Sequence, residues 1–195
     1  MPRQFMFTRE DIIAAALALT REGGAGAVTA RALGQRLGTS SKPVFGLFRN
    51  MEEVQQGVLI AADVLYRRYL ETDMAAGKYP PYKGSGMAYI RFAREERELF
   101  KLLFMRDRVS EGQYSDQTNF DLVFNIIKKE TPLDDETALR FFERTWLFIH
   151  GLAVCIATKY IPCQDERYLI SMVKEAYNAA VKMMNLEGVL KLQEI

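Results

Sequence analysis

The segment LGTSSKPVFGLFRN, from Leu37 to Asn50, places hydroxyls and a cation just before a set of apolar side chains. The hydroxyl and ammonium groups of Ser40–Lys42 can bind phosphate oxygens and the polar edges of bases. The apolar side chains of Val44 and Phe48 can anchor a short helix to a core. Such an element, polar at its start and apolar behind, has the chemistry of a helix that binds DNA.

Two short predicted helices position this segment. Thr29 caps a helix through Leu37, Gly38 breaks it, and a third helix follows from about Ser41 to Leu47. Ser40 is placed to cap that third helix, and a proline in its first turn, Pro43, is tolerated because the N–H groups there have no intrahelical acceptor. These are the proportions of a helix-turn-helix. An ordinary helical hairpin has the same spacing, so both interpretations stay open at this point.

The helix that precedes them has clear end signals. Thr8 and Asp11 have the spacing of a capping box, with aspartate in the place of the usual glutamate. Phe7 can pack on Ile12 as a hydrophobic staple, and the Gly23-Gly24 pair ends the helix.

The remainder of the chain shows helical spacing of apolar residues and no period-2 strand pattern of useful length. We therefore predict an all-α fold of about nine helices. The segment 77–86, GKYPPYKGSG, is the clearest predicted linker because it holds two prolines and three glycines. The later predicted helices cover residues 52–76, 87–104, a segment ending at 130 after a loop at 108–115, 135–160 and 166–186.

Charge is distributed unevenly along the chain. The net charge is only +1, yet residues 1–50 hold seven basic and three acidic groups, which suggests a basic DNA-reading end. Two cysteines are too few for a disulfide framework, so we expect a reducing cytoplasmic compartment. The most apolar stretch, Trp146–Ala157, falls short of the ~20 residues that span a bilayer, so no membrane association is expected.

Residues 8–54, TREDIIAAALALTREGGAGAVTARALGQRLGTSSKPVFGLFRNMEEV, resemble the N-terminal DNA-binding domain of the TetR/AcrR family of transcriptional regulators. The matching features are the Thr-led first helix, the Thr before the second, the Leu-Gly turn and the two phenylalanines before an acidic helix start. The stretches AYIRFAREERELFKLLF and WLFIHGLAVCIA resemble later parts of many members. The resemblance implies a helix-turn-helix three-helix domain at 1–50 and a larger helical effector-binding and dimerisation domain at 51–195.

The resemblance also implies which residues contact DNA. Phe45 stands where the family usually has a tyrosine that donates to a phosphate, and Met51 stands where a lysine commonly lies, so Arg49 is expected to substitute. The implied DNA-binding residues are Thr29, Arg31, Ser40, Ser41, Lys42, Pro43, Phe45 and Arg49.

The family forms dimers through its last two helices, which implies a homodimer here on a double-stranded, palindromic operator. Small and methionine side chains of these helices were expected at the interface: Ala153, Ala157, Leu169, Met172, Val173, Ala176, Ala180, Met183 and Met184. An aromatic group on the middle helices is expected to line a small-molecule effector pocket, although such side chains also make ordinary core. This group consists of Tyr66, Tyr89, Phe92, Phe104, Phe124, Trp146 and His150.

The predicted function is therefore a dimeric, sequence-specific DNA-binding regulator, a repressor released by a small apolar or aromatic effector. The alternative is a helical interaction or ligand-binding module that has lost DNA binding. An enzyme is not expected, because the chain has one histidine and lacks a Walker loop and a His-Glu-x-x-His motif. No metal or cofactor is expected either, since the spacing of His150, Cys155 and Cys163 does not put them on one helix face.

Overall fold

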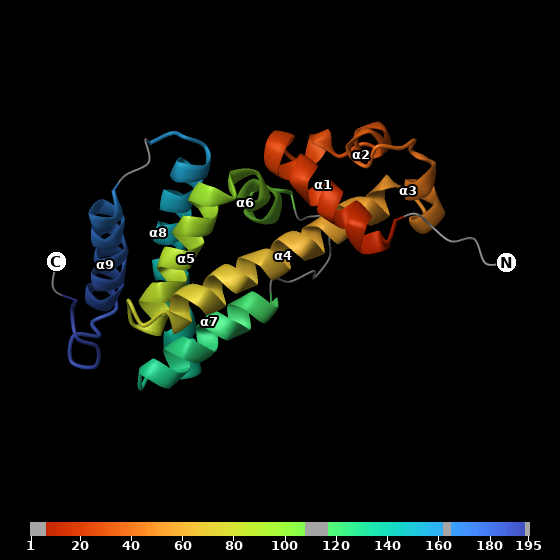
Figure 1. Cartoon of the computed structure of the whole chain (residues 1–195). Coiled ribbons are helices and arrows are strands. Elements are labelled where there is room, and N and C mark those ends of the chain that lie inside the picture. Colours follow the sequence, from red (N-terminus) through yellow and green to blue (C-terminus); the bar gives the residue numbers. More distant parts are fainter. Residues whose placement is uncertain (1–6, 108–116, 162–164, 194–195) are drawn as a thin grey trace. The chain divides into compact units, whose positions relative to one another are not determined.

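The computed structural model describes residues 7–107, 117–161 and 165–193 (Figure 1). Within these ranges the chain is helical and forms no strand, which confirms the all-α prediction. A short 3-10 turn, Ala25–Ala27, follows the first helix. The α-helices are α1 (Arg9–Gly23), α2 (Ala30–Arg36), α3 (Lys42–Leu47), α4 (Met51–Ala75), α5 (Pro81–Glu95), α6 (Arg97–Phe104), α7 (Gln117–Glu130), α8 (Asp135–Ala157) and α9 (Glu166–Met183).

The chain forms two compact units. Residues 1–66 and 96–106 belong to the first, which we call the N-terminal unit, and residues 67–95 and 107–195 belong to the second, the C-terminal unit. Helix α4 therefore contributes its first sixteen residues (51–66) to one unit and its last nine (67–75) to the other.

The N-terminal unit is built on α1, whose start has the predicted capping box. The backbone N–H of Asp11 donates to Thr8 Oγ1 (3.1 Å), and the N–H of Thr8 donates to the carboxylate of Asp11 (2.9 Å). At the other end of α1, Nε and Nη2 of Arg21 each donate to a carboxylate oxygen of Glu96 at 2.7 Å, just before α6. The buried core consists of Ile12, Ala15, Ala16, Val28, Leu33, Val44, Phe48, Val54 and Val58.

The turn between α2 and α3 depends on two glycines. Gly38 has a positive φ of 67°, a conformation that glycine adopts without the steric cost of a Cβ. The next residue, Thr39, donates its N–H back to the carbonyl of Gly34 (2.8 Å). A Cβ on Gly34 would lie 2.9 Å from the carbonyl oxygen of Thr39 and from the backbone carbon of Ser40. Helix α2 and the turn can therefore touch only because residue 34 has no side chain.

The C-terminal unit is organised around α5, which packs on α8 and also contacts α7 and α9. Buried side chains of α5 include Tyr89 and Phe92. The core shared by α7, α8, α9 and the segment after α9 consists of Ile127, Leu133, Ala138, Phe141, Ala180, Val181, Leu186 and Leu190.

The predicted linker at 77–86 is wrong in its second half. Only residues 76–80 connect the two helices, and Pro81 begins α5, a position that suits proline because a first-turn N–H needs no intrahelical acceptor. A Cβ on Gly84 would lie 3.2 Å from the carbonyl oxygen of Asp73, and one on Gly86 would lie 3.6 Å from Val173 Cγ1. Gly84 thus allows α5 to approach α4 closely, whereas a Cβ on Gly86 would make only an ordinary van der Waals contact with α9.

Three further boundaries differ from prediction. The expected helix at 87–104 lies within two helices, because Glu96 (φ −116°, ψ 50°) leaves helical geometry between α5 and α6. Helix α8 ends at Ala157 and α9 at Met183, each before a residue with positive φ, Lys159 and Asn185 respectively. The loop predicted at 108–115 lies outside the described residues.

Replacing Gly34 with alanine should destabilise the N-terminal unit. We expect Gly34→Ala to lower the free energy of unfolding by about 1–3 kcal/mol, since the added methyl meets backbone that cannot move aside without shifting the turn. Urea unfolding followed by circular dichroism measures the loss. Gly26→Ala is the matched control, because no atom lies within 4 Å of the Cβ it would add. Equal stability of the two variants would contradict the close contact at Gly34.

Candidate nucleic-acid interface

Helix α3 presents one exposed face and buries the other. Lys42, Phe45 and Gly46 are exposed, and positions three and four apart lie on the same side of a helix. Phe45 is 52% exposed, a large value for an aromatic side chain. On the opposite side Val44 and Phe48 are buried in the core of the N-terminal unit, as predicted from their apolar character.

The start of α3 differs in detail from the prediction. Ser41, not Ser40, occupies the N-cap position, and no side chain caps the helix there. Ser40 Oγ instead accepts a long hydrogen bond from the N–H of Lys42 (3.4 Å). Pro43 lies in the first turn, as expected. Ser40 is exposed and Ser41 is partly exposed, and within the described ranges the Ser41 hydroxyl has no hydrogen-bond partner.

Two exposed cations near this face have no acidic partner among the described residues. Arg31 lies in the first turn of α2 and Lys42 at the start of α3. Arg36, by contrast, bonds to the carboxylate of Glu22 at 2.5 Å. Arg31 and Lys42 are thus available to an external anion, whereas Arg36 is held by its own chain.

The start of α4 is tied to α1 through Glu53. Its carboxylate accepts the backbone N–H of Arg49 (2.7 Å) and the guanidinium of Arg9 (2.8 Å), and these two bonds, in that order, lower the pKa of Glu53. Asn50 Oδ1 accepts the N–H of Glu53 (2.9 Å) and caps the helix. Arg9 also lies over the ring of Phe48, 4.0 Å from its centroid. The side chain of Arg49 remains 89% exposed, 3.5 Å from Glu53.

Two further residues of this region, Gly46 and Met51, have places that were not predicted from the sequence. Gly46 shares the exposed face of α3, which its spacing of four from Lys42 could have indicated. Met51 was considered only as a missing DNA contact, but its side chain is half-buried and packs on the core of the N-terminal unit.

The seven residues predicted for an effector pocket fall into separate groups. In the N-terminal unit, the rings of Tyr66 and Phe104 meet edge to face at 5.2 Å. In the C-terminal unit, the hydroxyl of Tyr89 lies 2.8 Å from Nδ1 of His150, whose ring stacks on Trp146 at 4.8 Å.

The remaining two of the seven residues also pack against other rings. Phe92 is fully buried and meets Tyr69 edge to face, and Phe124 stacks on Phe120. These contacts are aromatic packing, and the effector pocket among these residues stays a prediction.

Helix α8 leaves an apolar stripe exposed, and α9 leaves two separate apolar side chains exposed. On α8, Leu139, Trp146 and Leu147 lie on one face with Gly151, and Leu147 is 61% exposed. On α9, Tyr168 and Met183 are exposed, fifteen residues apart and so on one face, and Met183 is 71% exposed.

Most residues named from the sequence for the subunit interface serve the core of their own unit. The small and apolar side chains concerned are buried within the single chain, which leaves them no surface to offer a second copy. They are Ala153, Ala157, Leu169, Val173, Ala176 and Ala180.

Two general properties of the described ranges bear on other classes of site. No helix there has the length and apolarity needed to cross a bilayer. No three potential metal-binding side chains come together there. Cys163, one of the three residues considered as ligands from the sequence, lies outside the described residues.

Thr29 has a structural role beside its predicted DNA contact. Its Oγ1 accepts the backbone N–H of Ala32 (3.1 Å) and caps α2, as the sequence predicted. Thr29→Ala should therefore lower the free energy of unfolding by about 1 kcal/mol, and Thr29→Ser should retain most of it. Lys42→Ala is the control, with a change expected within about 0.5 kcal/mol because its side chain has no partner among the described residues. Chemical denaturation measures all three variants, and an unaffected Thr29→Ala would rule out the cap.

Two solved structures are similar to this chain over nearly its whole length. One is a proposed transcriptional regulator of the TetR family from Vibrio parahaemolyticus, at 19% identity and a TM-score of 0.56, with 94% of this chain and 98% of that chain covered. The other is SmeT, the repressor of the multidrug efflux pump SmeDEF of Stenotrophomonas maltophilia, at 20% identity and a TM-score of 0.52, with 96% and 92% covered. No protein-family model and no curated protein matches the chain. The two structures show that the chain has the fold of TetR family regulators.

Proposed function

We propose that this chain is a transcriptional regulator of the TetR family that binds double-stranded DNA through α2 and α3. The observation that carries the proposal is the exposed face of α3, with Lys42 and the Ser40 and Ser41 hydroxyls at its start. Buried Val44 and Phe48 hold the opposite face in the core, so α3 can present these groups from a rigid support.

The proposed DNA contacts divide by role. Arg31, Thr29 and Arg49 would contact backbone phosphates, which position a protein on the duplex. Ser40, Ser41, Lys42 and Pro43 would lie at the edge of the major groove, where base contacts specify sequence. Phe45 cannot donate a hydrogen bond, but its exposed ring can make an apolar contact with sugar or a thymine methyl group.

We propose that the regulator acts as a homodimer through α8 and α9 on a palindromic operator. The exposed stripe with Leu147 on α8 and the exposed side chain of Met183 on α9 support this proposal. Gly151 lies within the α8 stripe, and its missing side chain would allow a second helix to approach closely. Two DNA-reading units related by a two-fold axis match half-sites about one helical turn, or a multiple of it, apart.

A repressor released by a small apolar or aromatic effector is the proposed mode of action. The fold is shared with SmeT, which is the repressor of an efflux pump. In this mode residues 1–50 read DNA and residues 51–195 bind the effector and dimerise. Helix α4 is continuous from Met51 to Ala75, directly after α3, and so could transmit a displacement between the two functions.

Substitution of the free cations should weaken DNA binding. We expect Lys42→Ala and Arg31→Ala each to raise the Kd for operator DNA about tenfold, and to reduce the slope of log K against log salt by about 1. Fluorescence anisotropy on DNA from upstream of the coding region, beside a scrambled duplex at two salt concentrations, measures both quantities. Arg140→Ala on α8 is the control, since it removes the same charge outside α2 and α3.

If that DNA does not bind, selection from a random duplex library supplies the ligand for the same comparison. Failure of the library to yield a duplex, or equal binding by wild type and the Lys42 and Arg31 variants, would contradict the proposal. A failed selection would favour the alternative, an interaction module without DNA binding, whereas equal DNA binding by all three proteins would exclude Lys42 and Arg31 from the DNA interface.

A charge on the α8 stripe should separate the subunits. We expect Leu147→Glu to convert a dimer into a monomer, because the carboxylate would have to be buried without a partner at the apolar interface. Sedimentation equilibrium gives the mass directly. Phe45→Glu introduces the same charge at a similarly exposed apolar site on α3 and should remain dimeric. A Leu147→Glu protein that stays dimeric would place the interface elsewhere.

A further inference from the structure

A cavity of about 280 Å³ lies within the C-terminal unit, lined by the end of α4, the connection to α5, α5 itself and the first turn of α9. Its apolar lining includes Met87, Ile90 and Leu169, all three of them buried. Ionised side chains make up much of the rest of its lining. None of the seven residues predicted for an effector pocket lines it. This volume is just under the ~300 Å³ at which ligand pockets begin, so it suits a small molecule.

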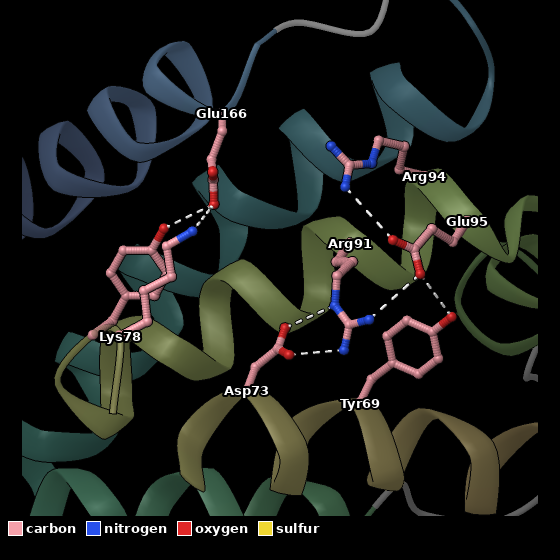
Figure 2. Close-up of polar contacts among 8 residues, drawn as sticks. Tyr69, Asp73, Lys78, Arg91, Arg94, Glu95 and Glu166 are labelled. Atoms are coloured by element: carbon pink, nitrogen blue, oxygen red, sulfur yellow. Dashed lines mark hydrogen bonds and ion pairs between the residues drawn. The ribbon is translucent and has the colours of Figure 1, made fainter. Parts of the chain in front are cut away.

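Both carboxylates of the lining are already neutralised by a cation. The carboxylate of Asp73 accepts two hydrogen bonds from the guanidinium of Arg91, from Nε at 2.9 Å and from Nη2 at 2.7 Å. Glu166 accepts hydrogen bonds from Lys78 and from the hydroxyl of Tyr79, the latter at 3.1 Å. Figure 2 shows the two pairs as separate contacts, one between α4 and α5 and the other between the α4–α5 connection and α9.

Arg94 is the remaining cation of the lining and has a weaker partner. Its ion pair in the described structure is with the neighbouring residue Glu95, at 3.6 Å. The Glu95 carboxylate also accepts from the hydroxyl of Tyr69 (3.0 Å) and lies 3.5 Å from Arg91. Figure 2 shows Arg94 joined to Glu95 and not to Asp73, and the charge of Arg94 contributes to the lowered pKa of Glu166, after the larger effects of Lys78 and Tyr79. The lining itself holds three cations and two carboxylates, and the carboxylate that pairs with the third cation, Glu95, lies outside the lining at the longer distance of 3.6 Å from Arg94.

We propose that this cavity binds a small organic carboxylate with an apolar chain or ring, the carboxylate on Arg94 and the apolar part against Met87, Ile90 and Leu169. An apolar floor beside a guanidinium that is held only by a 3.6 Å ion pair favours this ligand class over a neutral or cationic one, because a planar guanidinium pairs with a carboxylate through two parallel hydrogen bonds. An amine would be repelled by the positive charge of Arg94, and an alcohol would offer the guanidinium no negative charge. Binding is a property of the protein alone and does not require the chain to bind DNA.

The ligand would contact helices that lie far apart in the sequence. Arg94 and Ile90 belong to α5, whereas Leu169 belongs to α9, one of the two helices proposed for the dimer. An occupied cavity would add contacts between α5 and α9 beside the existing bridge from Lys78 to Glu166. Its occupant is therefore placed to stabilise the C-terminal unit.

Calorimetric titration of the full chain with octanoate tests the proposal, with 1-octanol and octylammonium as probes of equal chain length. We expect octanoate to bind at least tenfold more tightly than either control compound. Arg94→Gln should weaken octanoate binding about tenfold or more, the loss expected for a charged hydrogen bond. Arg140→Gln, the matched control on α8, should bind octanoate like the wild type.

Ala76→Leu provides an independent variant, because Ala76 lies in the cavity lining at an exposed position where a larger side chain fills space without disturbing the core. Circular dichroism shows whether each variant is folded. Ala76→Leu should abolish octanoate binding, and it tests the proposal even when Arg94→Gln does not fold. The absence of binding at millimolar octanoate, equal affinity for octanol, or equal binding by folded wild-type, Arg94 and Ala76 proteins would each overturn the proposal.

Discussion

Contact between the backbone of α2 and the turn that follows it determines where α3 presents its side chains. Gly34 permits this contact, and the left-handed conformation of Gly38 directs the chain into it. With the turn in place, Val44 enters the core and the opposite face of α3, with Lys42 and Phe45, is left outside. The exposure of Lys42 and Phe45 on α3 therefore depends on the lack of a side chain at Gly34 in α2.

The same use of small residues explains the main error of the sequence analysis. Gly84 and Gly86 were interpreted as linker residues, since glycine usually marks a turn. In the structure both lie in α5, and a Cβ on Gly84 would lie only 3.2 Å from the backbone carbonyl oxygen of Asp73. A glycine in a turn is needed for its own dihedral angles, which the local sequence can indicate. A glycine at a close helix contact is needed because of residues that lie far away in the sequence, which the local sequence cannot indicate.

The site residues also divide into those fixed by local contacts and those fixed by contacts between distant parts of the sequence. The caps at Thr8 and Thr29 were predictable, because each depends on a hydrogen bond to a residue three positions away. The cavity in the C-terminal unit was not predictable, because its lining depends on ion pairs such as that of Lys78 with Glu166, 88 residues apart. No periodicity or motif relates such residues. The aromatic side chains that were predicted to line an effector pocket pack against other rings and do not line this cavity.

Ion pairing changes the meaning of the basic N-terminal segment. Seven basic residues in the first fifty suggested a broad cationic surface, but Arg9, Arg21 and Arg36 are each bonded to a carboxylate of the same unit. Arg31 and Lys42 have no such partner among the described residues, and Arg49 keeps most of its surface exposed. The three available cations in the described part of this segment would form few phosphate contacts, so they would contribute only a moderate salt dependence to DNA binding. Selectivity would then have to come from the hydroxyls and the exposed ring on α3, because contacts with bases, unlike those with phosphates, distinguish one sequence from another.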